Sequence, residues 1–415
     1  MPPVSVAVTG FGIISPFGRG ADENVSGLRE GRSGLVSQRP EWVEKKLRSH
    51  VSGQIDIESL RPLFDRKMSR FLCDPALLCA AAMKDAIDHA GLSTEEVENP
   101  RSGIALGTGG GSSMMDVLSF GQKVDRRGGA KAGAYHVPLI MGSSSTANIG
   151  SIFRIRGYSC TMTSACATSA HTIMQGLDLI RSGRQDRVFA GGSEDINVYS
   201  AAAFDGMNAL SSAFNDTPAR ASRPLDRGRD GFVFSGGAGV VVLENLEVAR
   251  ARGAKILAIV EGAAATCDGD DMVSPNGIGA ESAMNLAMAD AGVAKDEIDY
   301  INLHGTSTPV GDLVELEAIL RVFGKNVPAF SSTKSMTGHG LGAAGVQEAI
   351  FSVLMMQERF LAPNINLEDP EPLVGDLPVV RSTTEGTPTL ALSNSFGFGG
   401  TNCSLVLSHP ERSSL

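Results

Sequence analysis

One cysteine stands among small residues at the start of an apolar stretch, TSACATSAHTIMQGLDLI at residues 163–180. The pattern predicts a helix over Ala167–Arg181 that is apolar on nearly every side, which is typical of a buried helix. A thiol in its first turn would face unpaired backbone N–H groups and the positive end of the helix dipole, so we expect a lowered pKa for Cys166. Such a thiolate could act as a nucleophile, although a small core residue is the more frequent explanation for one buried cysteine.

Two further stretches carry side chains that could act with this thiol. NLHGTSTPVGD (302–312) places His304 directly after an apolar strand, and SSTKSMTGHGLGAAG (331–345) places Lys334 and His339 before an Ala- and Gly-rich helix. A single histidine is usually structural, and Lys334 alone would be a solvated surface residue. Here, however, two of only seven histidines lie at strand exits, where α/β folds place ligand-binding groups.

The elements that must position these residues alternate between short β-branched runs and Ala- and Leu-rich helical runs, which indicates an α/β fold in layers. The expected strands are Val4–Val8, Ile104–Leu106, Arg187–Phe189, Val240–Leu243, Ile256–Val260, Tyr300–Leu303 and Leu405–Leu407. The expected helices are Asp74–Ala90, Ala167–Arg181, Ala280–Ala291, Val314–Val322 and Gly345–Gln357.

The sequence contains an internal similarity. FVFSGGAGVVVLE, from Phe232, resembles FGFGGTNCSLVLS, from Phe396. TSACATSAHTI, from Thr163, has a looser counterpart in TGHGLGAAGVQ, from Thr337. Two pairs in the same order predict a duplicated αβ unit, with an N-terminal half at 1–250 and a C-terminal half at 251–415.

Length and composition exclude several classes of protein. A chain of 415 residues with a net charge of −10 exceeds the usual size of one core and lacks the basic face of a general nucleic-acid binder. We expect no membrane span and no secretory signal, since no apolar run is long enough and the first residues are not basic. The six cysteines form no CxxC pairs or disulfide pattern, so we expect a reduced, cytoplasmic protein.

Several short motifs imitate known sites without their essential residues. TGFGIIS has Ser15 at the third glycine position of a dinucleotide fingerprint, and GTGGGSS (107–113) lacks the Gly-Lys-Ser/Thr ending of a P-loop. Ser331-x-x-Lys334 imitates a penicillin-binding pair, but no Lys-Thr-Gly follows. Neither His nor Cys recurs at metal spacing, so we expect no zinc.

The chain resembles the β-ketoacyl-acyl carrier protein synthases, the condensing enzymes of fatty acid synthesis. VTGFGIISPFG, TSACATSA, VFAGGSED, LDRGRDGFV, HGTSTPVGD, TKSMTGHGLGAAG and NSFGFGGTN occur in the order of that family, nearly from end to end. REGRSG, DRKMSRF (65–71) and GAAGVQEAI are most similar to the bacterial type I branch. Where type I enzymes tend to have Gly-His-Ser-Leu, this chain has Gly340 in place of the serine.

The resemblance implies a thiolase-like fold with five layers (αβαβα) built from two related halves, and a homodimer. It assigns the nucleophile to Cys166 and the two catalytic histidines to His304 and His339, with Lys334 behind the second histidine. Phe398 matches a gating phenylalanine whose backbone N–H joins that of Cys166 in an oxyanion hole.

The same resemblance suggests further binding residues. Thr306 and Thr308 match threonines that hydrogen-bond the pantetheine arm, Glu315 matches a structural or electrostatic carboxylate, and Gly110 matches a small residue that leaves the acyl pocket wide. Gly110 could equally be only a flexible turn residue. Basic residues that could dock an acidic carrier protein are Lys67, Arg70, Lys123, Arg126, Arg127 and Lys131.

The implied activity is a decarboxylative Claisen condensation of an acyl-enzyme with malonyl-acyl carrier protein, an acyltransferase reaction that requires no metal, nucleotide or flavin. A type II synthase with another chain-length range is the alternative within the family. A thiolase would need a second active-site cysteine, for which Cys403 is the candidate, and a non-catalytic partner subunit would typically lack the nucleophile that Cys166 provides.

Overall fold

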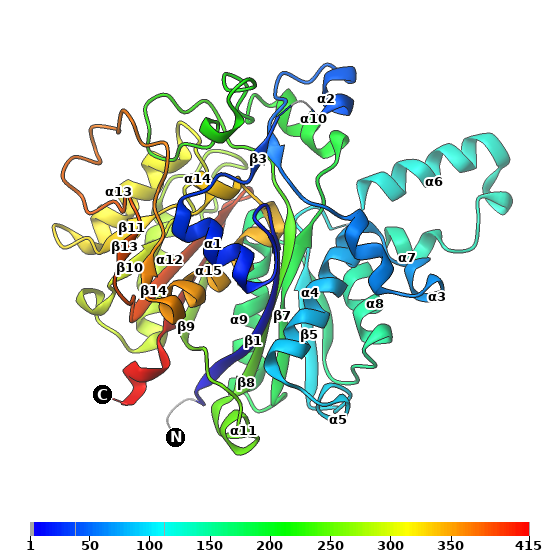
Figure 1. The fold of residues 1–415 in the computed structure, drawn as a ribbon, viewed down its shortest axis with the longest axis horizontal. Coiled ribbons are helices and arrows are strands. Elements are labelled where there is room, and N and C mark those ends of the chain that lie inside the picture. Colours follow the sequence, from blue (N-terminus) through cyan, green and yellow to red (C-terminus); the bar gives the residue numbers. More distant parts are fainter. Residues whose placement is uncertain (1–3, 38, 112, 415) are drawn as a thin grey trace.

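The computed structural model describes residues 4–37, 39–111 and 113–414. Its centre is one mixed sheet of 11 strands (Figure 1). The strands in spatial order are β11 (Ala329–Ser331), β10 (Tyr300–Asn302), β14 (Leu390–Gly397), β15 (Thr401–Ser408), β9 (Ala258–Cys267), β1 (Val6–Ser15), β8 (Gly237–Asn245), β7 (Arg187–Glu194), β5 (Ser102–Gly107) and β6 (Ser159–Met162), with β2 (Gly18–Arg19) beside β1.

The sheet consists of two units with the same topology. The strand order is β6-β5-β7-β8-β1 in the first unit and β11-β10-β14-β15-β9 in the second. Along each order, the first two pairs of neighbouring strands are parallel and the next two are antiparallel. Antiparallel pairing of β1 with β9, at Val6 and Val260, joins the units. The predicted α/β duplication is therefore confirmed. The division at residue 250 falls inside α11 (Leu246–Ala251) and stays a prediction.

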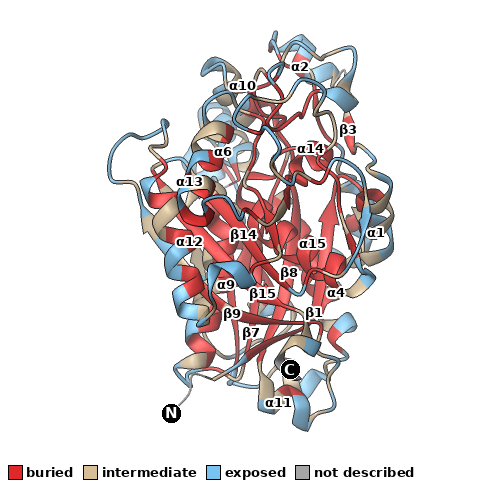
Figure 2. Ribbon diagram, turned by 90° about the vertical axis from the view of Figure 1, so that its left-hand side faces the viewer, coloured by how far each residue is buried: buried red, intermediate tan, exposed pale blue. Residues whose placement is uncertain are grey.

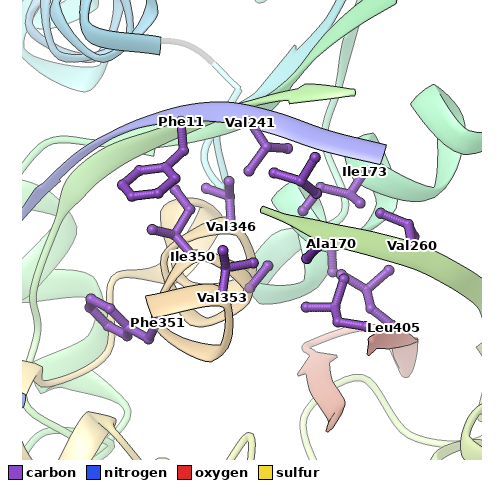
Figure 3. Close-up of a cluster of buried hydrophobic side chains, with 14 of the residues drawn as sticks. Phe11, Ala170, Ile173, Val241, Val260, Val346, Ile350, Phe351, Val353 and Leu405 are labelled. Atoms are coloured by element: carbon purple, nitrogen blue, oxygen red, sulfur yellow. The ribbon is translucent and has the colours of Figure 1, made fainter. Parts of the chain in front are cut away.

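Helices separate and cover the two halves of the sheet. The central helices α9 (Thr168–Arg181) and α15 (Ala344–Glu358) contribute Ile173, Val346 and Ile350 to a core that both units share (Figure 3). On the outer faces, α4 (Asp74–Ala90) and α8 (Ser144–Ile152) cover the first unit, while α12 (Ile278–Ala291) and α13 (Gly311–Phe323) cover the second. Burial is concentrated in the strands and the two central helices (Figure 2). This is the expected five-layer αβαβα arrangement.

The remaining elements are short or peripheral. They are α1 (Ala21–Glu30), α2 (Pro40–Glu44), α3 (Arg66–Ser69), α5 (Thr94–Val97), α6 (Met114–Arg127), α7 (His136–Ile140), α10 (Val198–Gly206) and α14 (Lys334–Thr337), with the strands β3 (Leu35–Val36), β4 (Ser52–Gly53), β12 (Phe360–Leu361) and β13 (Thr384–Glu385). Helix α6 projects from the body of the molecule beside α3 and α7 (Figure 1), and no residue of α6 is buried. Among the described residues, no helix is both long and apolar enough to span a membrane.

Every strand and helix that the sequence predicted is present, with α4 at the expected bounds and most others extended by a few residues. Among the longer elements, strands β6, β11 and β14 and helices α1, α6, α8 and α10 were not predicted. Ser and Asn interrupt the apolar pattern of β14, and α6 is a mainly polar helix on the surface. Periodicity reports burial on one face, so it misses elements whose faces are polar or fully enclosed.

Candidate active site

Three of the four predicted catalytic residues, Cys166, His304 and His339, meet at one cavity of about 420 Å³. They come from both units of the duplication, since Cys166 precedes α9 and the histidines follow β10 and α14. The predicted residues among those that line the cavity are Cys166, His304, Thr306, Thr308, Glu315, His339 and Phe398. Apolar rings, among them Phe204, Phe232 and Phe396, supply much of the remaining wall.

Cys166 lies in a 3₁₀ turn, Ala165–Ala167, and the α-helix begins only at Thr168. The expected lowering of its pKa is wrong, because burial raises the pKa of the Cys166 thiol to about 11. Hydrogen bonds from the backbone amides of Phe398 and Cys166 and the positive charge of Lys334 act in the opposite direction. The loss of hydration therefore outweighs the favourable dipoles at the helix start.

Two backbone amides converge beside the thiol. The N–H of Phe398 reaches the sulfur of Cys166, and Gly397 packs so closely that a Cβ there would lie 3.0 Å from the Cys166 nitrogen. Thr401 secures this approach by donating a hydrogen bond to the carbonyl of Ser164 at 3.0 Å. Such a pair of amides can stabilise the oxyanion of a thioester under attack.

The rings of His304 and His339 face each other edge-on, with centroids 5.2 Å apart. Among the described residues, no group hydrogen-bonds Nδ1 of His304 or either ring nitrogen of His339. Burial, followed by the charge of Lys334, lowers the pKa of both imidazoles well below the usual range, and His339 further lowers that of His304. Both rings are therefore neutral at neutral pH, and each can donate one N–H to a substrate oxygen.

Lys334 lies behind the cavity rather than in its wall, and only 2% of its side chain is exposed. Its ammonium forms a buried ion pair with Glu348 of α15. Burial raises the pKa of Glu348 to about 7, against the effect of Lys334. Glu348 was not predicted from the sequence, although a lone carboxylate in the apolar stretch GAAGVQEAI is a signal that could have identified it.

Glu315 holds the backbone that carries His304. Its carboxylate accepts the N–H groups of His304 and Gly305 at 2.8 and 2.7 Å, and Asn394 donates to it at 3.3 Å. Burial raises the pKa of Glu315 to about 7. These bonds place Glu315 where a structural carboxylate was expected.

The turn after His304 presents two hydroxyls to the cavity. Thr306 and Thr308 lie with their hydroxyl oxygens 3.1 Å apart. Asp312, at the start of α13, accepts the N–H groups of Ser307 and Thr308 at 3.0 and 3.3 Å and so fixes the turn. Ser307 adopts a φ of 71°, which is uncommon for a residue other than glycine.

The other residues that the sequence singled out do not line the cavity. Gly110 is not among its lining residues, and a Cβ there would lie 3.9 Å from Glu194. Cys403 is fully buried in the core between the units, so it cannot supply the second active-site thiol of a thiolase. The basic residues Lys67, Arg70, Lys123, Arg126, Arg127 and Lys131 are all exposed, in or beside α3 and α6.

Glu194, at the end of β7, is a second carboxylate that the sequence analysis missed. Its Oε2 accepts the N–H of Gly109 at 2.7 Å and that of Gly342 at 3.0 Å, which joins the two units. Burial, and then the neighbouring Asp195, raise the pKa of Glu194 to about 8. A charged residue at the end of a buried strand was the available signal.

Known proteins match this chain over nearly its whole length. The β-ketoacyl synthase N-terminal domain family matches residues 4–249, and the C-terminal domain family matches residues 257–368. The chain is 48% identical to 3-oxoacyl-[acyl-carrier-protein] synthase 1 of Haemophilus influenzae, over 96% of this chain and 97% of the relative. It is 47% identical to the Escherichia coli K12 protein of the same name, over 96% and 98%.

The fold also matches that of a solved β-ketoacyl synthase. A crystal structure of a β-ketoacyl synthase from Burkholderia phymatum superimposes with a TM-score of 0.92 at 31% identity, and the match covers 98% of this chain and 99% of the other. The matched domains cover the first unit and much of the second, up to residue 368, including the turns that carry Cys166, His304 and His339. The chain belongs to the β-ketoacyl synthase family, in its thiolase-like fold.

Proposed function

We propose that this protein is a type I β-ketoacyl-acyl carrier protein synthase, an acyltransferase that performs the condensation step of fatty acid elongation. The observation that carries the proposal is one cavity in which a buried thiol, two neutral imidazoles and two converging amides meet. The names of the relatives at 47 and 48% identity support the carrier-bound substrate and the type.

In the first half-reaction, the sulfur of Cys166 attacks the carbonyl of an acyl thioester borne by the carrier protein. The amides of Cys166 and Phe398 hold the oxyanion. The bond between the acyl carbon and the carrier sulfur then breaks, so the acyl group stays on Cys166. The thiol proton of Cys166 ends on the released thiol of the carrier, which balances the exchange.

In the second half-reaction, a malonyl thioester enters with its arm along Thr306 and Thr308. His304 and His339 donate hydrogen bonds to the thioester oxygen, so loss of carbon dioxide leaves a stabilised enolate. The enolate carbon attacks the acyl carbon on Cys166, and the carbon–sulfur bond to the enzyme breaks. Cys166 takes up one proton, and a 3-oxoacyl thioester longer by two carbons remains on the carrier.

The Cys166→Ala variant tests this assignment directly. We expect the purified variant to fold but to form no covalent acyl-enzyme with an acyl carrier thioester, as measured by intact-protein mass spectrometry. Cys160→Ala, which removes an exposed thiol on β6, is the matched control and should load normally. Condensation by Cys166→Ala at the wild-type rate would contradict the proposed nucleophile.

The histidine variants separate the two half-reactions. His304→Ala and His339→Ala should still load the acyl group, because the thiol and the two amides remain. They should lose the release of carbon dioxide from malonyl carrier protein. Equal loss of loading and decarboxylation would refute the roles assigned to the imidazoles.

The carrier protein would dock on the basic surface of α3 and α6. We define this docking surface as Lys67, Arg70, Lys123, Arg126, Arg127 and Lys131, all exposed. Arg70 links its two parts, because its guanidinium lies 4.7 Å from the ring centre of Phe71 and 5.0 Å from that of Tyr135, next to α7. Local positive charge on a chain with a net charge of −10 favours an acidic partner.

The assembly and compartment are also part of the proposal. Strand β6 ends the sheet, and its residues Ser159 and Cys160 are exposed, which fits pairing with a second copy in a homodimer. Sedimentation at equilibrium would give twice the chain mass, and a monomer would refute the proposed homodimer.

A reducing cytoplasm suits a thiol nucleophile among six free cysteines, and cell fractionation tests that location.

A further inference from the structure

The turn that carries Cys166 is held in an unfavourable backbone conformation. Ala165, directly before it, has a φ of +49°, in the left-handed region that residues with a side chain rarely adopt. Such a conformation persists only where the surroundings enforce it. The groups that enforce it also determine where the next amide, that of Cys166, points.

Thr168 is the residue best placed to hold this turn. It is fully buried, and its hydroxyl accepts the N–H of Ser164 at 2.8 Å and donates to the carbonyl of Ala165 at 2.7 Å. The hydroxyl of Thr168, just after the turn, therefore binds two successive residues, Ser164 and Ala165, at its start. Its methyl group is also confined, because a Cβ at Gly107 would lie 2.4 Å from it.

The second unit of the duplication contains an equivalent turn that is held in a different way. The 3₁₀ turns Ala165–Ala167 and Leu341–Ala343 both lead directly into a central helix. The residues that open them have φ values of +49° and +46°. By this equivalence Cys166 corresponds to Gly342, two residues beyond Gly340, with which the sequence similarity from Thr163 and Thr337 pairs it. The N–H of Gly342 is taken by the carboxylate of Glu194.

The two turns are thus secured through different backbone groups. Glu194 ends β7, and the equivalent end of β14 is Gly397, which has no side chain with which to take the N–H of Cys166. Thr168 instead uses the N–H of Ser164 and the carbonyl of Ala165. The turn is held without engaging the amide that faces the cavity.

We propose that Thr168 is a positioning residue for the oxyanion hole, whose hydroxyl holds the 164–166 turn so that the N–H of Cys166 stays aimed beside that of Phe398. This inference rests on the proposed role of Cys166 as the nucleophile. Without the hydroxyl, Ala165 relaxes toward a right-handed conformation and the Cys166 amide turns away. The thiol remains, but thioester attack loses one donor.

Three variants isolate the hydroxyl. Thr168→Val keeps the shape and removes the hydroxyl, whereas Thr168→Ser keeps the hydroxyl and removes the methyl group. Thr172→Val is the matched control, because Thr172 is also fully buried in α9 and donates to the carbonyls of Ser169 and Gly191 at 2.8 and 2.9 Å. It touches no atom of the turn through its hydroxyl bonds.

Two rates at Cys166 are then compared by mass spectrometry. Acyl loading from a carrier thioester forms an oxyanion that the two amides must stabilise. Alkylation by iodoacetamide forms no oxyanion and depends on the amides only through the pKa of the Cys166 thiol. We expect Thr168→Val to slow loading by about 100-fold, the scale typical of a displaced or lost donor, and to slow alkylation far less. Thr168→Ser should restore most of the loading rate, and Thr172→Val should lower the thermal midpoint while leaving the ratio of the two rates unchanged.

The outcomes distinguish the two proposals. Normal loading in Thr168→Val, or an equal fall of both rates, overturns the positioning role and leaves the proposed function standing. A wild-type protein that never loads at Cys166 overturns the proposed function itself. If Thr168→Val does not fold, Thr168→Ser and Thr168→Ala form the test pair, since they differ only in the hydroxyl, and equal loading rates would overturn the inference.

Discussion

At the scale of single residues, the loss of hydration in the cavity keeps Cys166 in its thiol form at neutral pH. The position at a helix start predicted a thiolate. The loss of hydration, however, disfavours the charged form more than the two backbone amides and Lys334 stabilise it. The neutral histidines follow from the same desolvation. A site without net charge on these three groups suits an uncharged thioester as its first ligand.

The pH dependence of alkylation tests this protonation state. Because the pKa of Cys166 is raised to about 11, its thiolate fraction is small at neutral pH and grows as the pH increases. We expect the rate of iodoacetamide modification at Cys166 to rise about tenfold per pH unit from pH 7 to pH 9 without levelling. A plateau below pH 8, measured by peptide mass spectrometry, would contradict it.

At the scale of elements, apolar patterns were sufficient for the helices and strands with one clear buried face. The positions of His304 and His339 after apolar runs were also predictable. Glu348 and Glu194 were not recognised, because the partners that explain them lie 14 and 148 residues away in the chain. Local sequence does not report such long-range contacts.

Helix α6 provides the element-scale prediction. The triple variant Lys123→Glu, Arg126→Glu, Arg127→Glu should lower kcat/KM for a carrier-borne thioester by at least tenfold at low salt, since it reverses the charge that meets an acidic partner. A pantetheine thioester without the carrier should react at the wild-type rate. Lys325→Glu, at an exposed position after α13, serves as the control.

Two results would count against the docking surface. One is an equal loss with both substrates, which would indicate damage to the cavity rather than to docking. Salt screens the attraction between exposed charges. The other contrary result is therefore a wild-type kcat/KM for the carrier-borne thioester that does not fall at high salt.

At the scale of the whole molecule, Glu194 links the two units through Gly109 and Gly342. Its pKa is raised to about 8 in the folded protein from an ordinary value of 4.5. The folded state therefore holds a proton that the unfolded chain releases, so this contribution to stability is present below about pH 4.5 and is lost as the pH rises to 8. Asp195 and Cys166 are the titratable neighbours that interact with it.

Glu194→Gln should remove the contribution of Glu194 to the pH dependence of folding stability. The side-chain amide can still accept both backbone N–H groups, but it does not ionise. Between pH 5 and 7.5, the free energy of unfolding of the wild type should fall by up to about 1.4 kcal/mol more per pH unit than that of the variant. Urea unfolding at several pH values measures both slopes. Parallel slopes would contradict the raised pKa.

The duplicated helix start also has an evolutionary consequence. A protein with one copy of the unit could bring two such turns together only by associating with itself, and both turns would then have been identical. In one chain, the two copies can differ from each other. The first turn carries a thiol and leaves its amide open, whereas in the second turn Glu194 takes the equivalent amide and an imidazole stands three residues earlier, at His339. Two copies joined in one chain can therefore supply a nucleophile from one turn and a hydrogen-bond donor from the other.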